Sequence, residues 1–196
     1  MAINGSLVTI LEESLEELLE ASNHCVNYSK SGPPWDNQRT GGCLGYPGGI
    51  LLFSIIDSIG SYFRKNKDFK IIVDGKQTTI NHSGWEHFKI LNSKYFDLNL
   101  SEADLKMLYN QYRSSMTHNA VLGNGVFMYP STEHTKVDNL PFVILRYEDG
   151  IVIPIVFLKE LYQACRMAVN QFKLEMDKIV TESDQFQIMG LNNKRS

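Results

Sequence analysis

The sequence lacks a surplus of positive charge and any long apolar run. Its 196 residues carry 19 Lys and Arg against 22 Asp and Glu, a net charge of −3, so no global positive field attracts nucleic acid or an anionic membrane surface. No apolar run approaches the ~18 residues of a membrane span, and glutamates occupy the start, where a signal peptide would be basic and then apolar. These absences predict a cytoplasmic protein that has no membrane partner.

Cysteine and metal-binding patterns are also scarce. The three cysteines, Cys25, Cys43 and Cys165, form no CxxC pair, so we expect reduced thiols rather than a disulfide framework or a zinc ribbon. The five histidines include no HExxH motif and no pair spaced i, i+4 on a helix. We therefore expect no metal and no cofactor, with Cys43 as the one accessible thiol.

The composition favours one core. With 43% apolar residues, a chain of this length is expected to fold as a single domain, residues 1–182, followed by a polar and disordered tail, residues 183–196. Apolar residues at helical spacing predict four major helices, at residues 6–28, 50–64, 101–118 and 157–180, and one further short helix at 85–91. Ser101 and Asp104 form a variant capping box that marks the start of the third.

Turn signals predict a small β insertion before the last helix. Residues 142–148 and 151–155 flank an Asp149-Gly150 turn, and residues 126–129 are a candidate third strand. Pro154 predicts an edge position, since proline cannot donate to a ladder. A weaker β pattern surrounds Asp74-Gly75. The expected fold class is mainly α, a four- to five-helix up-and-down bundle with a small β-hairpin insertion.

Two further features bear on function. Asp57 lies inside the apolar helix 50–64, so it needs an Arg, a hydroxyl or a helix N-terminus as partner. The Gly-rich loop 31–49 precedes that helix but lacks the Lys-Ser/Thr of a phosphate-binding loop. A flexible connection is the favoured interpretation of the loop, and a small-molecule site between Trp35 and Cys43 is a remote alternative.

The strongest candidate site is at the end of the helix 101–118, in the segment NQYRSSMTHN. Arg113 can hold a phosphate, and His118 can move a proton near neutral pH. Together they suffice for RNA cleavage by attack of a 2′-hydroxyl, without a metal. On an ideal helix the two side chains are ~140° apart. They converge only if the helix ends near Thr117 or a second subunit completes the site.

Arg113-Ser-Ser-Met-Thr-His118 resembles the R-x4-6-H motif of the HEPN superfamily. The similarity extends loosely over residues 6–180, through a cysteine late in the first helix, Asp57 in a buried helix and the lead-in LYNQYR. The resemblance implies a metal-independent ribonuclease with a composite site in a homodimer cleft, acting as a toxin or in defence. Arg113 and His118 would be catalytic. Ser114, Asn119, Asp57 and Tyr112 would support them; active members often carry a more polar residue than Ser114 after the Arg.

A second interpretation gives the same motif a structural role. Arg113 would then pair with Asp57, and His118 would interact with the helix C-terminus, where a cation is favoured. The protein would be a noncatalytic HEPN-like binding or scaffold protein that holds a protein partner. The net negative charge favours this alternative slightly.

Overall fold

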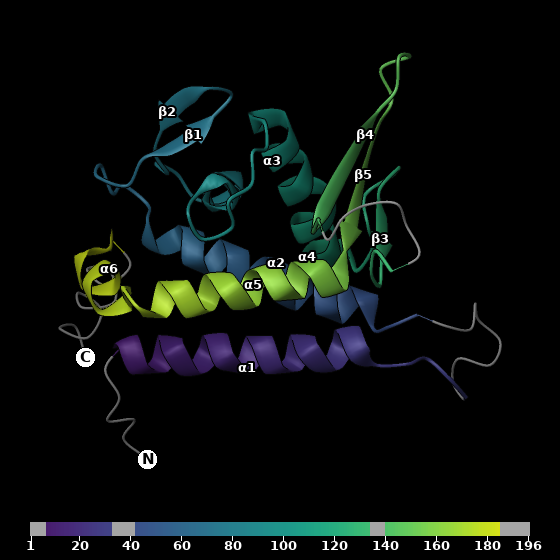
Figure 1. Ribbon diagram of the computed structural model, residues 1–196, viewed down its shortest axis with the longest axis horizontal. Coiled ribbons are helices and arrows are strands. Elements are labelled where there is room, and N and C mark those ends of the chain that lie inside the picture. The colour runs from purple at the N-terminus through teal and green to yellow at the C-terminus, as the bar shows by residue number, and fades with distance from the viewer. Residues whose placement is uncertain (1–6, 33–41, 134–139, 185–196) are drawn as a thin grey trace. The chain divides into compact units, whose positions relative to one another are not determined.

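The computed structural model describes residues 7–32, 42–133 and 140–184, and its fold is mainly α-helical (Figure 1). The α-helices are α1 (Leu7–Asn27), α2 (Gly45–Tyr62), α3 (Glu102–Leu108), α4 (Ser115–Asn119), α5 (Leu158–Lys173) and α6 (Met176–Glu182). A 3-10 helix, η1 (Gly84–Asn92), and a π-helical turn, η2 (Tyr109–Ser114), complete the helical elements of these residues. None of the described helices combines the length and apolar character needed to cross a membrane.

Five short strands form two sheets within the described residues. The strands are β1 (Ile71–Val73), β2 (Lys76–Thr78), β3 (Phe127–Tyr129), β4 (Phe142–Arg146) and β5 (Val152–Phe157). β1 and β2 form an antiparallel hairpin, whose turn has Asp74 and Gly75 at positive φ, 51° and 71°. Such a turn matches the twist of a hairpin, which explains the Asp-Gly signal in the sequence.

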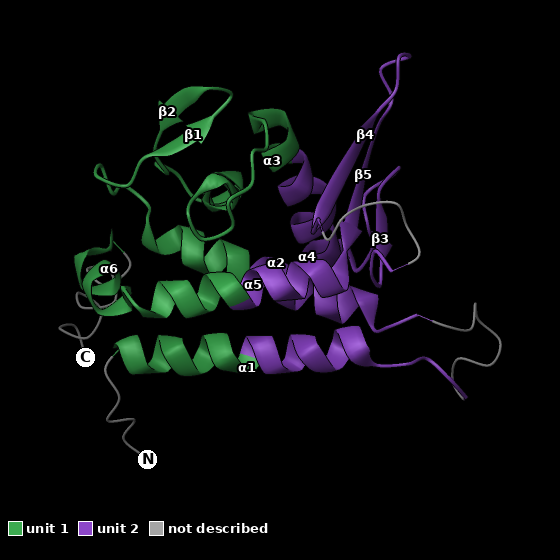
Figure 2. Ribbon diagram, in the orientation of Figure 1, with its two compact units in different colours: residues 1–17, 55–106, 167–196 green, residues 18–54, 107–166 purple. Residues whose placement is uncertain are grey.

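The chain divides into two compact units, coloured separately in Figure 2. Unit 1 comprises residues 1–17, 55–106 and 167–196, and unit 2 comprises residues 18–54 and 107–166. The single domain expected over residues 1–182 stays a prediction. Most of the expected tail lies outside the described residues, but Ser183 is buried and Asp184 lies 2.9 Å from the Lys65 ammonium. The ordered chain therefore extends slightly beyond its predicted end.

Aromatic packing fills the core of unit 1. The Phe63 ring lies 3.9 Å from the Phe69 ring, and both Phe63 and Tyr95 contact Phe172 from α5. Gly60 in α2 allows the backbone of η1 to approach closely, because a Cβ at this position would lie 2.2 Å from the His87 carbonyl oxygen. The two segments can pack at this distance only with glycine at position 60.

A three-stranded mixed sheet characterises unit 2. β5 is central, antiparallel to β4 and parallel to β3. β5 is thus not an edge strand, but Pro154 itself lies at an edge position, as predicted, because β3 does not extend opposite it. Proline is tolerated because β3 begins opposite Ile155, so Pro154 is paired only with Ile144 of β4. Its missing N–H removes no bond to β3.

The four major predicted helices are present, with two interruptions. The helix expected over 157–180 breaks after Lys173, where Leu174 is 85% exposed, and resumes as α6. The helix expected over 101–118 contains the π turn η2. The short helix expected at 85–91 is a 3-10 helix. The mainly α class and the β insertion before the last long helix are confirmed.

Candidate functional site

The candidate site lies on the helical segment formed by α3, η2 and α4. This segment begins at a capping box. The Ser101 hydroxyl accepts from the Asp104 backbone N–H at 3.2 Å, and Asp104 Oδ2 accepts from the Ser101 hydroxyl at 2.7 Å and, more weakly, from its backbone N–H at 3.3 Å. The capping prediction is confirmed. A start fixed in this way sets the rotation of the side chains in the first turn of α3.

The π turn surrounds Arg113. In a π turn the hydrogen bond runs from residue i+5 to residue i, and here the backbone N–H and the hydroxyl of Ser115 both donate to the Asn110 carbonyl. Single π turns inside helices occur frequently at functional sites. Because such a turn holds more residues than an α turn, each residue advances by a smaller angle. The π turn ends at Ser114, however, and Ser114 and Ser115 have α-helical dihedral angles, so the separation of Arg113 and His118 stays close to the ~140° of an ideal α-helix.

Arg113 and His118 have different surroundings. Arg113 is half-buried, and its guanidinium carbon lies 6.0 Å from the centre of the Tyr109 ring, within the range of a cation–π contact. His118 is exposed in the last turn of α4, and among the described residues no side chain forms a hydrogen bond or ion pair with it. The structure brings the two onto one segment but joins them by no contact.

The end of the helix presents small polar groups to solvent. α4 ends at Asn119, after which Ala120 adopts the left-handed conformation with φ of 53°. Asn119 is exposed and Ser114 is half-exposed. The Thr117 hydroxyl donates to the Arg113 carbonyl at 2.7 Å, so the backbone of this turn is joined to the exposed helix end.

Tyr112 is a core residue that ties the helix to the sheet. Its ring is fully buried, and its hydroxyl lies 2.8 Å from the carbonyl oxygens of both Phe127 and Pro154. Burial raises the pKa of this hydroxyl far above its ordinary value. Tyr112 therefore positions the segment that carries Arg113 rather than facing a ligand.

Asp57 has a partner that its sequence context did not suggest. Its carboxylate lies 2.7 Å from Nδ1 of His87, which is only 6% exposed, whereas the sequence predicted an Arg, a hydroxyl or a helix N-terminus. Sequence reasoning missed His87 because the two residues are far apart in the chain. Asp57 belongs to unit 1 and Arg113 to unit 2. A direct pairing between them stays a prediction.

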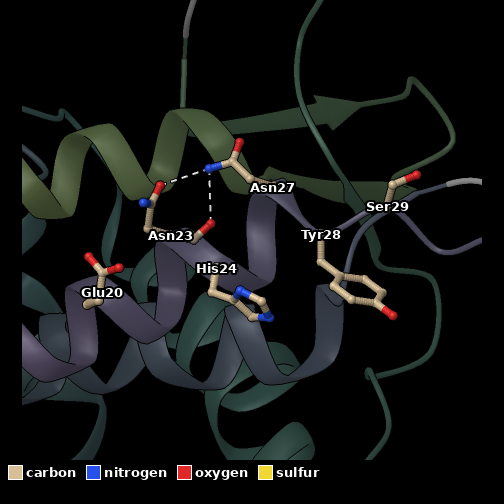
Figure 3. Close-up of a pocket in the computed structure, with 6 residues that line it drawn as sticks. All are labelled: Glu20, Asn23, His24, Asn27, Tyr28 and Ser29. Carbon is tan, nitrogen blue, oxygen red and sulfur yellow. Dashed lines mark hydrogen bonds between the residues drawn. The ribbon is translucent and has the colours of Figure 1, made fainter.

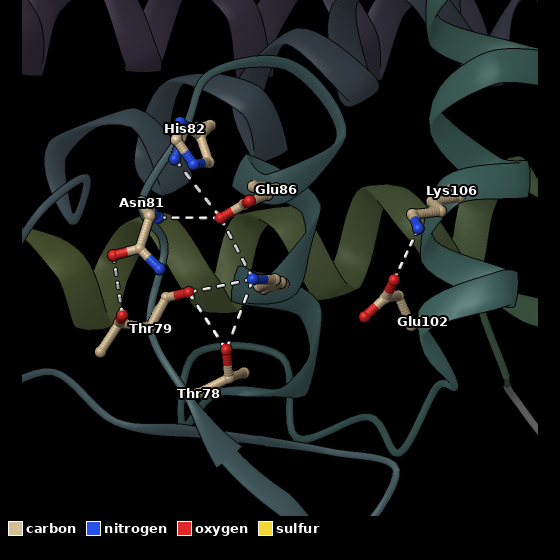
Figure 4. A network of polar contacts seen from close by, with 8 residues as sticks. Thr78, Thr79, Asn81, His82, Glu86, Glu102 and Lys106 are labelled. Carbon is tan, nitrogen blue, oxygen red and sulfur yellow. Dashed lines mark hydrogen bonds and ion pairs between the residues drawn. The ribbon is translucent and has the colours of Figure 1, made fainter.

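A second polar network surrounds Glu86 in unit 1 (Figure 4). Glu86 Oε2 accepts from the Asn81 backbone N–H at 2.8 Å and lies 3.1 Å from the Lys89 ammonium. Burial opposes the charge on Glu86, but these hydrogen bonds hold the pKa of its carboxyl below the ordinary value. The Lys89 ammonium also donates to the Thr79 carbonyl. The network closes the loop before η1 and presents no reactive group.

Described residues of unit 2 line at least two hollows. One, of about 480 Å³, is open and polar, and follows the end of α1 (Figure 3). It is lined by Glu20, Asn23, His24, Asn27, Tyr28 and Ser29. Asn27 donates to the side-chain oxygen of Asn23 at 2.8 Å, so part of the polar lining is already satisfied within the helix. The lining also carries one carboxylate, one imidazole and two hydroxyl groups.

The other hollow, of about 210 Å³, includes Lys30, Cys43 and Tyr46 near the start of α2. The expectation of an accessible Cys43 is wrong, because this thiol is 7% exposed and burial raises its pKa. A thiol that stays protonated is a poor nucleophile. The small-molecule site considered between Trp35 and Cys43 falls mostly outside the described residues.

Sequence reasoning also missed a column of three aromatic rings, those of Phe127, Tyr129 and Phe157, on the sheet to which Tyr112 is hydrogen-bonded. Phe127 and Tyr129 of β3 have nearly parallel rings with centres 6.4 Å apart, and Tyr129 is stacked in turn on Phe157 of β5, 6.1 Å away. The available signal was the alternation Phe127-Met128-Tyr129, which places the two aromatic side chains on one face of a strand.

Comparison with known proteins adds no relative. No family model matches the chain, and neither a curated protein nor a solved structure does. Within residues 7–32, 42–133 and 140–184, no three His, Cys, Asp or Glu side chains come together as metal ligands.

Proposed function

We propose that the protein is a HEPN-like, metal-independent endoribonuclease whose site contains Arg113 and His118. The observation that carries the proposal is the combination of a π turn at Arg113 with an exposed His118 at the end of the same helical segment. Arg113 supplies a permanently charged guanidinium at a partly exposed position. His118 supplies an exposed imidazole, with which no described side chain forms a hydrogen bond or ion pair.

The chemistry follows from these two side chains. A ribose 2′-hydroxyl attacks the adjacent phosphorus and loses its proton, while the bond to the 5′-oxygen breaks and that oxygen gains a proton. The products are a 2′,3′-cyclic phosphate and a 5′-hydroxyl. Arg113 stabilises the extra negative charge on the phosphate oxygens, and His118 takes part in the proton transfer.

The same proposal includes the arrangement of the helices and the oligomeric state. The segments α1, α2, α3 to α4 and α5 would form a four-helix up-and-down bundle of the HEPN kind, and two copies would join as a homodimer in the cytoplasm. A second copy could bring an additional His118 opposite Arg113, which compensates for their separation on one helix. Size-exclusion chromatography with light scattering tests the dimer directly.

Cleavage of an RNA pool in EDTA tests the activity. Wild-type protein should produce 2′,3′-cyclic phosphate ends, and Arg113→Ala and His118→Ala should lower the rate by about 10²-fold or more. Arg166→Ala and His82→Ala are matched controls, since both positions are exposed and lie outside the motif. Equal cleavage by all five proteins would reject the assignment.

A second candidate function is noncatalytic binding of a protein partner. The observation that favours it is the half-buried position of Arg113 over Tyr109, because such an arginine also stabilises the helix. On this alternative Arg113→Ala lowers the melting temperature, and wild-type protein leaves RNA intact. Melting curves recorded beside the cleavage assay separate the two functions.

A further inference from the structure

Strand β3 presents an aromatic surface that is partly open to solvent. Phe127 is 45% exposed and Tyr129 is 46% exposed, whereas the third ring of the column, Phe157, is only 2% exposed. The column therefore begins in the core and ends at the surface. Met128, between the two exposed rings, faces the opposite side, where its side chain lies next to Gly45 and Gly49 of α2.

The rings are held in place before any ligand arrives. Phe127 and Phe157 belong to paired strands, with Tyr129 opposite Phe157 in the parallel register. The Phe127 carbonyl accepts from the Tyr112 hydroxyl. A rigid aromatic side chain loses little conformational entropy on binding, so a column fixed in this way favours stacking with a planar ligand.

Two basic residues, Arg113 and Lys159, belong to segments that are hydrogen-bonded to β3 or to the residue after it. At the start of β3, the Tyr112–Phe127 hydrogen bond joins the strand to the residue preceding Arg113. Just after its end, the Pro130 carbonyl accepts from the backbone N–H of Lys159, at the first turn of α5. The Lys159 ammonium lies 3.4 Å from Glu133 in an exposed ion pair, which a phosphate can displace at little cost.

We propose that Phe127 and Tyr129 form a stacking site for unpaired bases of single-stranded RNA, with the phosphate backbone running toward Arg113. Stacking on aromatic side chains combined with nearby cations is the general chemistry by which proteins hold single strands. A duplex hides the faces of its bases and fits the site poorly. This inference deepens the proposed function, on which it rests, by naming single strands as the substrate class.

The assay uses the full chain in the His118→Ala background, so that RNA is not consumed. Fluorescence anisotropy measures the binding of a labelled single-stranded oligoribonucleotide and of the same strand annealed to its complement. Phe127→Leu and Tyr129→Leu should each weaken single-strand binding by about 5- to 150-fold. Phe127→Trp keeps an aromatic face and should retain binding.

Tyr147→Leu is the matched control, because Tyr147 is 51% exposed and belongs to the turn between β4 and β5, away from the column. It should bind like the parent. Circular dichroism and melting curves establish that each variant is folded. Lys159→Gln should weaken binding at low salt and reduce the slope of affinity against salt concentration by about one.

The inference is overturned if the parent binds no single-stranded RNA, if folded leucine variants bind as tightly as the parent, or if the control loses as much affinity as they do. A protein bound at this surface in place of RNA would overturn it as well. The two proposals can fail separately. If wild-type protein does not cleave RNA but single-strand binding depends on Phe127, the nuclease is rejected and the stacking site is kept. If wild-type protein cleaves RNA and the leucine variants bind single strands as tightly as the parent, the stacking site is rejected and the nuclease is kept.

Discussion

Replacing Tyr112 with phenylalanine removes one oxygen from the core of unit 2. The hydroxyl lies 2.8 Å from two carbonyl oxygens, those of Phe127 in β3 and Pro154 in β5, and it is the group through which the helical segment and the sheet are hydrogen-bonded at this point. Phenylalanine fills the same volume, so the ring contact with Phe53, at 5.7 Å, should persist. The change isolates the hydrogen bond from the packing.

A buried hydrogen bond contributes about 1 kcal/mol net, and leaving acceptors unsatisfied adds to its loss. We therefore expect Tyr112→Phe to lower the free energy of unfolding by roughly 1.5 kcal/mol. In a chain of this size that corresponds to a melting temperature about 3–6 °C lower. Urea denaturation followed by circular dichroism measures the free energy, and differential scanning calorimetry measures the temperature.

Tyr162→Phe is the control for this change. Tyr162 is half-exposed on α5, and no described residue forms a hydrogen bond with its hydroxyl, so its loss should change stability by less than about 0.5 kcal/mol. A Tyr112→Phe protein as stable as wild type would refute the idea that this hydroxyl ties the two elements together. Loss of RNA cleavage in a stable Tyr112→Phe protein would instead show that the hydroxyl positions the segment that carries Arg113.

Three further predictions concern other parts of the chain. Gly60→Ala should lower the free energy of unfolding by about 2 kcal/mol or more, because the new Cβ meets the His87 carbonyl oxygen. Gly45→Ala should lower it less in urea denaturation, because the new Cβ meets only side-chain ends, those of Met128 and Leu158. The pKa of Glu86 is lowered in the folded protein, so its carboxylate contributes stability above the ordinary glutamate pKa of about 4.3, and this contribution is lost as pH falls through the lower folded value. Urea denaturation from pH 7 to pH 3 should therefore show a smaller decrease in the free energy of unfolding for Glu86→Gln than for wild type. All three cysteines are buried and burial raises their pKa values, so a thiol reagent at pH 8 should label them rapidly only after denaturation, and rapid labelling of native protein would contradict their placement.

The sequence predicted the elements whose signals are local. Apolar spacing located the long helices, Ser101 and Asp104 located a helix start, and Asp74-Gly75 and Asp149-Gly150 located two turns. Each of these signals depends on residues within a few positions of one another. The break of the last long helix after Lys173 was missed because Met176 and Ile179 continue the apolar spacing and remain buried on α6.

Features that depend on distant partners could not be predicted in this way. His87 as the partner of Asp57, and β5 as the central strand around Pro154, follow from contacts between separate segments. The π turn has the composition of an ordinary helix, because it differs in which carbonyl each N–H reaches rather than in residue type. For the candidate site, the sequence predicted the segment that carries Arg113 and His118 but not the core position of Tyr112 or the aromatic surface of β3.

The mixed sheet also implies an order of assembly. β4 and β5 are joined by the short turn from Tyr147 to Ile151, so their antiparallel ladder closes at small entropic cost. β3 is much further from β5 along the chain, and its parallel ladder must wait for a longer loop to close. Folding would then form the hairpin first and add β3, with Phe127 and Tyr129, in a later step. Pulse-labelling hydrogen exchange should show protection of the Ile153 amide region before that of Met128.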